Sequence, residues 1–117
     1  MGIVGIGIDV VAIARFDAAV AKSETFVERV FTPLERDLGH QSLAARWAAK
    51  EALAKALGAP GGLNWHDAQI GREHGGRPRL EVTGTVAARA AELGIKTFHV
   101  SLSHDAGIAS AVVIAED

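Results

Sequence analysis

One alanine-rich segment, RWAAKEALAKALG at residues 46–58, carries Lys50, Glu51 and Lys55 among small residues that could pack against almost anything. Trp47, Glu51 and Lys55 recur every four residues, so on a helix they form one ridge and Glu51 points partly inward. The simplest interpretation is a solvated Glu51–Lys55 pair worth about 0.3–0.5 kcal/mol. The alternative is that Glu51 meets another acidic group across an interface, with Lys50 and Lys55 flanking a polyphosphate.

Asp9 is the other acidic candidate, and it ends the apolar segment IVGIGID at residues 3–9. This segment is predicted to be a strand, with Ile6 and Ile8 on one face and glycines that permit close backbone approach. Asp9 is then either the N-cap of a following helix or a group that meets Glu51. Two converging carboxylates repel, whereas Mg²⁺ between them forms a hard oxygen site completed by water and phosphate.

The segment SLSHDAG, residues 101–107, places serine, histidine and aspartate side by side. It is not interpreted as a catalytic triad, because neighbouring residues on a strand point to opposite faces and His104 and Asp105 cannot line up behind Ser103. His104 is either a phosphate-contacting residue or a plain surface histidine. Arg77, at the start of a predicted strand, is ambiguous in the same way.

The elements that must position these groups follow from hydrophobic period and capping signals. Strands are expected at 3–9, 66–73, 77–84, 97–104 and 108–117. Helices are expected at 10–22, 25–30, 85–94 and from a Ser42 cap to a Gly58 stop. A further helix start is predicted at Thr32, where Glu35 would complete a capping box. The expected fold class is α+β, with a mainly antiparallel sheet packed against the long alanine-rich helix.

Composition narrows the possible classes of protein. The 117 residues predict a single domain, 1–117, that buries about 65% of its unfolded surface. The net charge of −2 does not indicate a nucleic acid or membrane partner, and the lack of cysteine excludes disulfides and thiolate ligands. Neither a secretory leader nor an apolar run of about 18 residues is present, so a cytoplasmic protein is expected.

Several separated segments, taken together and in order, resemble the signature segments of the holo-acyl-carrier-protein synthase type of 4′-phosphopantetheinyl transferase. Each motif is weak alone, but their joint order and spacing are specific. The segments are GIGIDVVAIARF (5–16), FTPLE (31–35), RWAAKEALAKALG (46–58), GGRPRL (75–80) and VSLSHDAGIASAVVIAE (100–116).

The resemblance implies a Mg²⁺-dependent transfer of the 4′-phosphopantetheine group from coenzyme A to a serine of apo acyl carrier protein, with release of adenosine 3′,5′-bisphosphate. It implies that Asp9 and Glu51 bind the metal and that Lys55 contacts phosphate and stabilises the departing group. It also implies a set of residues around the phosphates and the adenosine, namely Arg46, Lys50, Arg77 and His104. The general base is either Glu51 or a metal-bound water held by Asp9.

Partners and assembly are implied by the same resemblance. Arg15 matches a helix position that meets the acidic recognition helix of the carrier protein, which is of the fatty-acid or the polyketide type. Related proteins form trimers with the coenzyme between two subunits, so His104 is expected to act from the neighbouring chain. Larger relatives carry a third acid where this chain has Val11, so a two-carboxylate site is expected.

Three other functions compete with the transferase interpretation. A coenzyme A or nucleotide-binding module would need the basic residues but not the acidic pair. A Mg²⁺-dependent phosphohydrolase would release adenosine bisphosphate without any carrier protein. A purely structural trimer would tolerate neutralisation of both Asp9 and Glu51 without functional loss.

Overall fold

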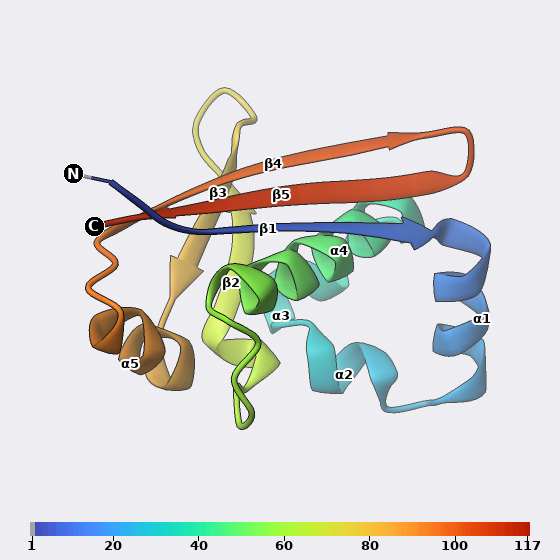
Figure 1. The fold of residues 1–117 in the computed structure, drawn as a ribbon. Coiled ribbons are helices and arrows are strands. Elements are labelled where there is room, and N and C mark those ends of the chain that lie inside the picture. The colour runs from blue at the N-terminus through green and yellow to red at the C-terminus, as the bar shows by residue number, and fades with distance from the viewer. Residues whose placement is uncertain (1) are drawn as a thin grey trace.

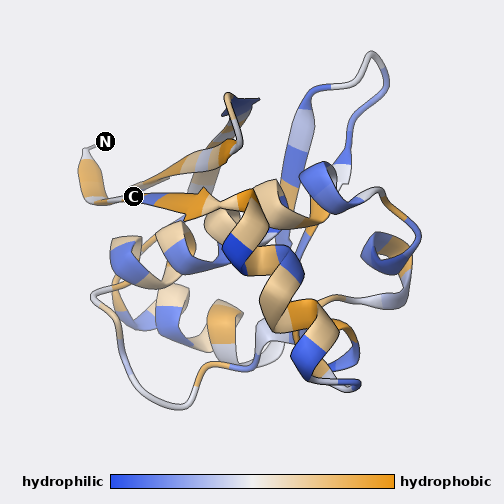
Figure 2. Cartoon of the chain, turned by 90° about the vertical axis from the view of Figure 1, so that its right-hand side faces the viewer, coloured by the Kyte–Doolittle hydropathy of each residue, from blue (hydrophilic) through white to orange (hydrophobic). Residues whose placement is uncertain are grey.

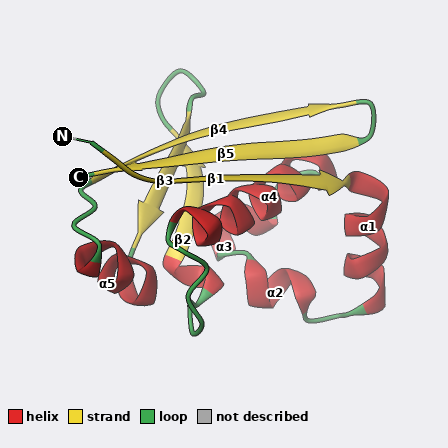
Figure 3. Cartoon of the chain, in the orientation of Figure 1, coloured by secondary structure: helices red, strands yellow, loops and turns green. Residues whose placement is uncertain are grey.

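The computed structural model describes residues 2–117, which form two antiparallel sheets, five α-helices and one short 3₁₀ helix (Figures 1 and 3). The strands are β1 (Ile3–Ala12), β2 (Ala68–Arg72), β3 (Pro78–Val82), β4 (Thr97–Asp105) and β5 (Ile108–Glu116). The helices are α1 (Ile13–Lys22), α2 (Phe26–Val30), α3 (Pro33–Arg36), α4 (His40–Ala56), η1 (Trp65–Asp67) and α5 (Gly84–Glu92). The predicted α+β class with antiparallel pairing is confirmed.

The long strands form a three-stranded sheet in the order β1-β5-β4, and α4 crosses beneath it (Figure 1). Alternate residues of the central strand β5 are buried against the helix, namely Ala109, Ala111, Val113 and Ala115. The facing positions of α4 are also mostly alanine, including Ala48, Ala52 and Ala56. Because small side chains lie on both surfaces, the helix packs unusually close to the sheet.

The closest approach is between the backbones of β1 and α4. A Cβ atom added to Gly7 would lie 1.7 Å from the carbonyl oxygen of Ala52, and one added to Gly5 would lie 2.0 Å from that of Ala56. Only glycine fits at these two positions, so the close backbone approach predicted from the sequence is confirmed. This contact sets the distance between the functional groups of β1 and those of α4.

The boundary between β1 and α1 differs from the prediction. The strand continues to Ala12 because residues 10–12 pair with Ser110, Ala109 and Ile108 of β5, and the helix begins at Ile13 rather than at residue 10. Long-range pairing therefore overrides the helical spacing of Val10. The N-cap of α1 is Ala12, so the interpretation of Asp9 as a helix cap is wrong.

The predicted start of α4 is wrong, whereas its predicted end is confirmed. The N-cap is Gly39 and the helix begins at His40, so Ser42 lies within the first turn and the predicted Ser42 cap is wrong. At the other end, Gly58 has a φ of +84° and donates from its N–H to the Lys55 carbonyl oxygen at 3.0 Å. This left-handed glycine confirms the predicted stop.

The second sheet is the predicted hairpin of β2 and β3, whose hydrophilic tip stands clear of the body of the molecule (Figure 2). Below α4, an aromatic cluster joins α1, α2 and η1 to the long helix through edge-to-face contacts. Phe26 lies 5.6 Å from Trp47 between ring centroids, and Trp47 lies 5.1 Å from Trp65. These contacts hold α4 by the side that carries Trp47, and Glu51 lies one turn further along the same side.

We expect Gly7→Ala to lower the free energy of unfolding by about 3 kcal/mol or more, because the new methyl group would overlap the Ala52 carbonyl and neither backbone can withdraw. Urea denaturation followed by circular dichroism measures this loss. The matched control is Gly61→Ala, where a Cβ would meet nothing within 4 Å. A loss at Gly7 no larger than at Gly61 would contradict the proposed backbone contact.

Candidate functional site

Asp9 of β1 and Glu51 of α4 line one pocket of about 390 Å³. Asp9 follows Gly5 and Gly7 on the face of β1 that packs on α4, and Glu51 lies one residue before Ala52, where the backbones touch. The prediction that the two carboxyl groups meet across the helix–strand interface is therefore confirmed. The rest of the lining is mainly apolar, with Phe16, Phe26 and Trp47 on one side and Arg15 also present.

Lys55 places a positive charge beside Asp9. Its Nζ lies 3.2 Å from Asp9 Oδ1 and donates to the Ile8 carbonyl oxygen at 2.9 Å. Its side chain is 52% exposed, whereas that of Asp9 is 19% exposed. The ammonium group is thus held at the carboxylate while it stays accessible to a ligand. The ion pair of Lys55 runs to the strand, not along the helix as the simplest sequence interpretation had it.

The pKa of Glu51 is raised, first by burial and then by the negative charge of Asp9, while Lys55 acts in the opposite direction. A cation between the two carboxylates would relieve this repulsion, and carboxylate oxygens are the ligands that Mg²⁺ prefers. Within residues 2–117, no cluster of three or more His, Cys, Asp or Glu side chains could hold a metal ion. The donor set therefore fits an ion that keeps most of its own water, bound by one acidic pair.

Lys50 lies elsewhere, although it precedes Glu51 directly. Its Nζ donates to Glu35 Oε1 at 2.8 Å, to the Val30 carbonyl oxygen at 2.8 Å and to the Trp65 carbonyl oxygen at 3.0 Å. Its side chain is fully buried, and all three of its N–H donors are used. The expectation that Lys50 flanks phosphate is therefore wrong, because no donor remains and no ligand can reach it.

Glu35, the partner of Lys50, is equally buried. One carboxylate oxygen accepts from the Thr32 N–H at 2.9 Å, as the predicted capping box requires, and the other accepts from the Ile70 N–H at 2.8 Å. The capping box at Thr32 is confirmed. Burial lowers the pKa of Lys50, and Glu35 acts against that effect through its hydrogen bond and its charge. The FTPLE segment is thus an internal anchor for α4.

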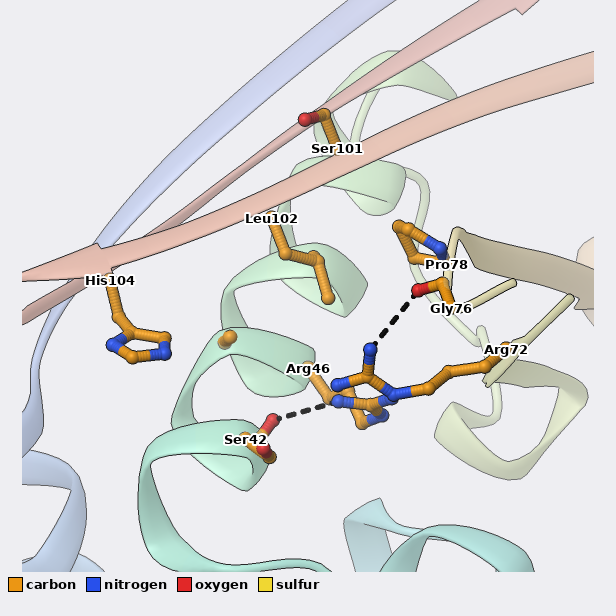
Figure 4. Close-up of a pocket in the computed structure, with 9 residues that line it drawn as sticks. Ser42, Arg46, Arg72, Gly76, Pro78, Ser101, Leu102 and His104 are labelled. Carbon is orange, nitrogen blue, oxygen red and sulfur yellow. Dashed lines mark hydrogen bonds between the residues drawn. The ribbon is translucent and has the colours of Figure 1, made fainter. Parts of the chain in front are cut away.

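A second pocket, of about 290 Å³, lies between the N-terminal half of α4, the hairpin and β4 (Figure 4). The pocket is lined by Arg46, Arg72 and His104, and also by Ser42 and Ser101. The guanidinium of Arg46 is almost fully buried, and its Nε donates to the Ile70 carbonyl oxygen at 2.9 Å. His104 lies two residues beyond Leu102 on β4 and points toward α4 (Figure 4).

Sequence reasoning did not single out Arg72, and the structure places Arg77 at a different pocket from Arg46 and His104. Arg72 follows Ile70 by two residues on β2, so strand alternation would have placed it on the same face as that buried residue. Arg77 instead lines a neighbouring, more open pocket between β3 and β4. Arg46, Arg72 and His104 thus line one pocket and Arg77 lines a neighbouring one, and the ligand contacts expected of Arg46, Arg77 and His104 stay predictions.

The two pockets lie on opposite sides of α4 within one chain. The acidic pocket opens beside β1 and α1, the basic pocket opens beside β4 and the hairpin, and they share no lining residue. The helix packs on the sheet between them without room for a ligand. A ligand that needs both groups would have to reach the second group on another copy of the chain.

The sequence and the fold are both similar to those of known proteins. A family model of the 4′-phosphopantetheinyl transferase superfamily matches residues 5–113. The holo-[acyl-carrier-protein] synthase of Streptomyces coelicolor is 63% identical over 99% of both chains, and that of Streptomyces avermitilis is 61% identical over 99% of both.

Solved structures extend the likeness to the fold. The holo-[acyl-carrier-protein] synthase of Neisseria meningitidis superposes with a TM-score of 0.90 at 32% identity, covering 99% of this chain and 100% of that one. The Helicobacter pylori enzyme, solved in complex with coenzyme A, gives a TM-score of 0.84 at 33% identity, covering 95% of this chain and 99% of that one.

The contrast between the two lysines of α4 is directly testable. We expect Lys50→Met to lower the free energy of unfolding by about 3–5 kcal/mol, because Glu35 would be left as a buried, unpaired charge. We expect Lys55→Met, which removes an exposed pair, to cost less than about 1 kcal/mol. Urea denaturation measures both.

A double variant, Glu35→Gln with Lys50→Met, should lose less than the sum of the two single losses, because neither charge is then left alone. Equal losses for Lys50→Met and Lys55→Met would show that Lys50 is not the internal anchor described above.

Proposed function

The chain belongs to the 4′-phosphopantetheinyl transferase superfamily, and we propose that it transfers the 4′-phosphopantetheine group of coenzyme A to a serine of apo acyl carrier protein. The observation that carries the proposal is the placement of Asp9 and Glu51 at one pocket, with Lys55 paired to Asp9. The curated relatives, which are named for this activity, match the chain almost end to end. The binding-module alternative leaves the acidic pair without a purpose.

We further propose that Asp9 and Glu51 bind Mg²⁺. Their hard oxygen atoms and the raised pKa of Glu51 support this assignment, because the repulsion between the two groups would be relieved by a cation. Bound there, Mg²⁺ would supply Lewis-acid neutralisation of the pyrophosphate of coenzyme A.

In the proposed reaction, the serine oxygen bonds to the phosphorus that carries pantetheine, and the bond from that phosphorus to the bridging oxygen breaks. Adenosine 3′,5′-bisphosphate leaves, and Lys55, already accessible beside Asp9, stabilises its new charge. The serine proton passes to a base in the same pocket. The two candidates for that base are Glu51, which lines the pocket, and a water held at Asp9.

The assembly we propose is a homotrimer with the site between subunits. The face of β1 turned away from α4 exposes Ile6, Ile8 and Val10 to between 59% and 61%, an unusual apolar surface for an isolated chain. Other copies of this chain are the occupant we assign to it, because the acidic and basic pockets of one chain lie on opposite sides of α4. Such packing would let His104 act from a neighbour.

The carrier protein is proposed to dock at Arg15, which lines the acidic pocket beside the apolar wall of Phe16 and Trp47. A local cation there would attract an acidic helix despite the net charge of the chain, an effect that salt weakens.

Among residues 2–117, no helix has the length and apolar character that a membrane span requires. We propose a cytoplasmic reaction without membrane or nucleic acid partners.

The transferase proposal predicts a phosphopantetheine mass gain on apo acyl carrier protein incubated with this protein, coenzyme A and Mg²⁺, as measured by intact-protein mass spectrometry. A chelator should abolish the gain, and Asp9→Asn or Glu51→Gln should slow it by at least about 100-fold. Glu92→Gln, which neutralises a carboxylate that pairs with Arg89 on α5, should leave the rate unchanged.

Each alternative gives a different result in this assay. Adenosine bisphosphate released without carrier protein would indicate a phosphohydrolase. Coenzyme A binding that is indifferent to chelator, with no mass gain on several carriers, would indicate a binding module. Full activity of both acidic variants would refute the metal site.

The trimer proposal predicts that Ile8→Lys sediments as a monomer in analytical ultracentrifugation and loses transfer activity, because a charge replaces the centre of the apolar face. Leu34→Lys changes an equally exposed apolar residue on α3, which lies beside β2 of the other sheet, and should stay trimeric. A monomeric wild-type protein that is active would refute the assembly.

A further inference from the structure

The FTPLE segment at residues 31–35 contacts Lys50 through both of its ends. Glu35 accepts from Lys50 Nζ at 2.8 Å, and the same ammonium lies 5.5 Å from the ring centroid of Phe31, where a cation–π contact adds to the ion pair. None of the residues 31–35 lines the acidic pocket or the basic pocket. Any effect of this segment on the chemistry must therefore pass through the elements that it holds.

Buried polar side chains are concentrated at this contact. Among residues 2–117, they are Thr32 and Glu35 of the segment and Arg46 and Lys50 of α4. No buried side-chain nitrogen or oxygen atom in this part of the chain lacks a hydrogen-bond partner. Glu35 is the hub, because its carboxylate accepts from Lys50 of α4, from the Ile70 N–H of β2 and from its own turn. A fully satisfied buried network favours a single arrangement of its members.

Apolar burial alone does not give α4 a preferred rotation about its axis. Residues 43–46 are four consecutive buried positions, and residues 48–50 are three more. Because a helix turns once in 3.6 residues, four consecutive positions cover its whole circumference. Most of the buried residues of α4 are alanine, and one methyl group can replace another when the helix rotates. The rotation therefore depends on directional contacts, and the Lys50–Glu35 pair is the one next to Glu51.

We propose that Glu35 is a positioning residue for the transfer reaction, because through Lys50 it fixes the rotation of α4 that turns Glu51 toward Asp9. This inference rests on the proposed function. Lys50 and Glu51 are consecutive and point about 100° apart, so a rotation that withdraws Lys50 from Glu35 also withdraws Glu51 from the pocket that it shares with Asp9. Glu35 lies outside that pocket and acts only through the helix.

The test compares two variants that lose stability for different reasons. In the paired variant, Glu35→Gln with Lys50→Met, neither charge is left alone, but no ion pair holds α4 to the segment. In the control, Val86→Ala, a cavity in the core lowers stability, and Val86 lines neither pocket. Both variants are assayed at a temperature at which circular dichroism shows them to be folded.

With coenzyme A, Mg²⁺ and carrier protein saturating, we expect kcat of the paired variant to fall at least about tenfold, and its KM for coenzyme A to change less than about threefold. This split is expected because Glu51 is displaced, whereas Arg46 keeps its own bond to the Ile70 carbonyl oxygen beside the basic pocket. Val86→Ala should keep both constants. An unchanged kcat in the paired variant, or an equal loss in Val86→Ala, would overturn the proposal.

A second readout needs no turnover. Trp47 lies one turn before Glu51 on the same side of α4, and its ring centroid is 5.1 Å from that of Trp65 on η1. The chain has two tryptophans, so the exciton signal of this pair in circular dichroism reports the orientation of α4 relative to η1. We expect the signal to weaken in the paired variant and to persist in Val86→Ala. A signal of wild-type strength in the paired variant would contradict a change in rotation.

Glu35→Asp keeps the proposal testable if the paired variant does not fold. It retains the charge that Lys50 needs, but its side chain is one methylene group shorter and should not reach Lys50 and Ile70 together. We expect it to fold and to lower kcat about threefold or more, and a wild-type kcat would refute the role of Glu35. Absence of transfer by the wild-type protein would count against the proposed function alone, because the tryptophan signal still decides whether the pair sets the rotation of α4.

Discussion

The buried ion pair between Lys50 and Glu35 is the interaction on which the placement of α4 depends. Burying two charges costs free energy unless their hydrogen-bonding groups have partners. Here both carboxylate oxygens and all three ammonium protons have one: the ammonium reaches the end of α2 and η1, and the carboxylate reaches α3 and β2. Four short elements are thereby tied to one turn of the long helix. The pair gives α4 a fixed rotation about its own axis.

That rotation decides which charges of α4 become available for chemistry. Consecutive residues of a helix point about 100° apart, so fixing Lys50 toward the interior directs Glu51 to the acidic pocket. Arg46, which lies one turn before Lys50, faces the basic pocket. Lys55, which lies one turn after Glu51, reaches Asp9. The buried charge of Lys50 and the charge of Glu51 that we propose binds metal thus stand side by side in the sequence, and their surroundings in the fold distinguish them.

Local signals predicted the parts of the structure that are local. The capping box at Thr32 and the Gly58 stop were accessible because turn chemistry determines them. The juxtaposition of Asp9 with Glu51 was one of two open interpretations of the residues, and only the family resemblance favoured it. The extension of β1 and the burial of Lys50 depend on residues far along the chain, β5 in one case and Glu35 in the other. No window of sequence contains both partners, so these features were predicted wrongly.

The contact of Gly5 and Gly7 with α4 has a consequence for how such a site can change over evolutionary time. Elsewhere in the core, a substitution can be absorbed by new rotamers, so the core can drift while the fold persists. Where two backbones touch, there are no rotamers to adjust, so a side chain added at Gly5 or Gly7 cannot be absorbed in this way. The spacing of the acidic pair therefore depends on the two glycines, which have no side chain, and not on the particular side chains of the surrounding core.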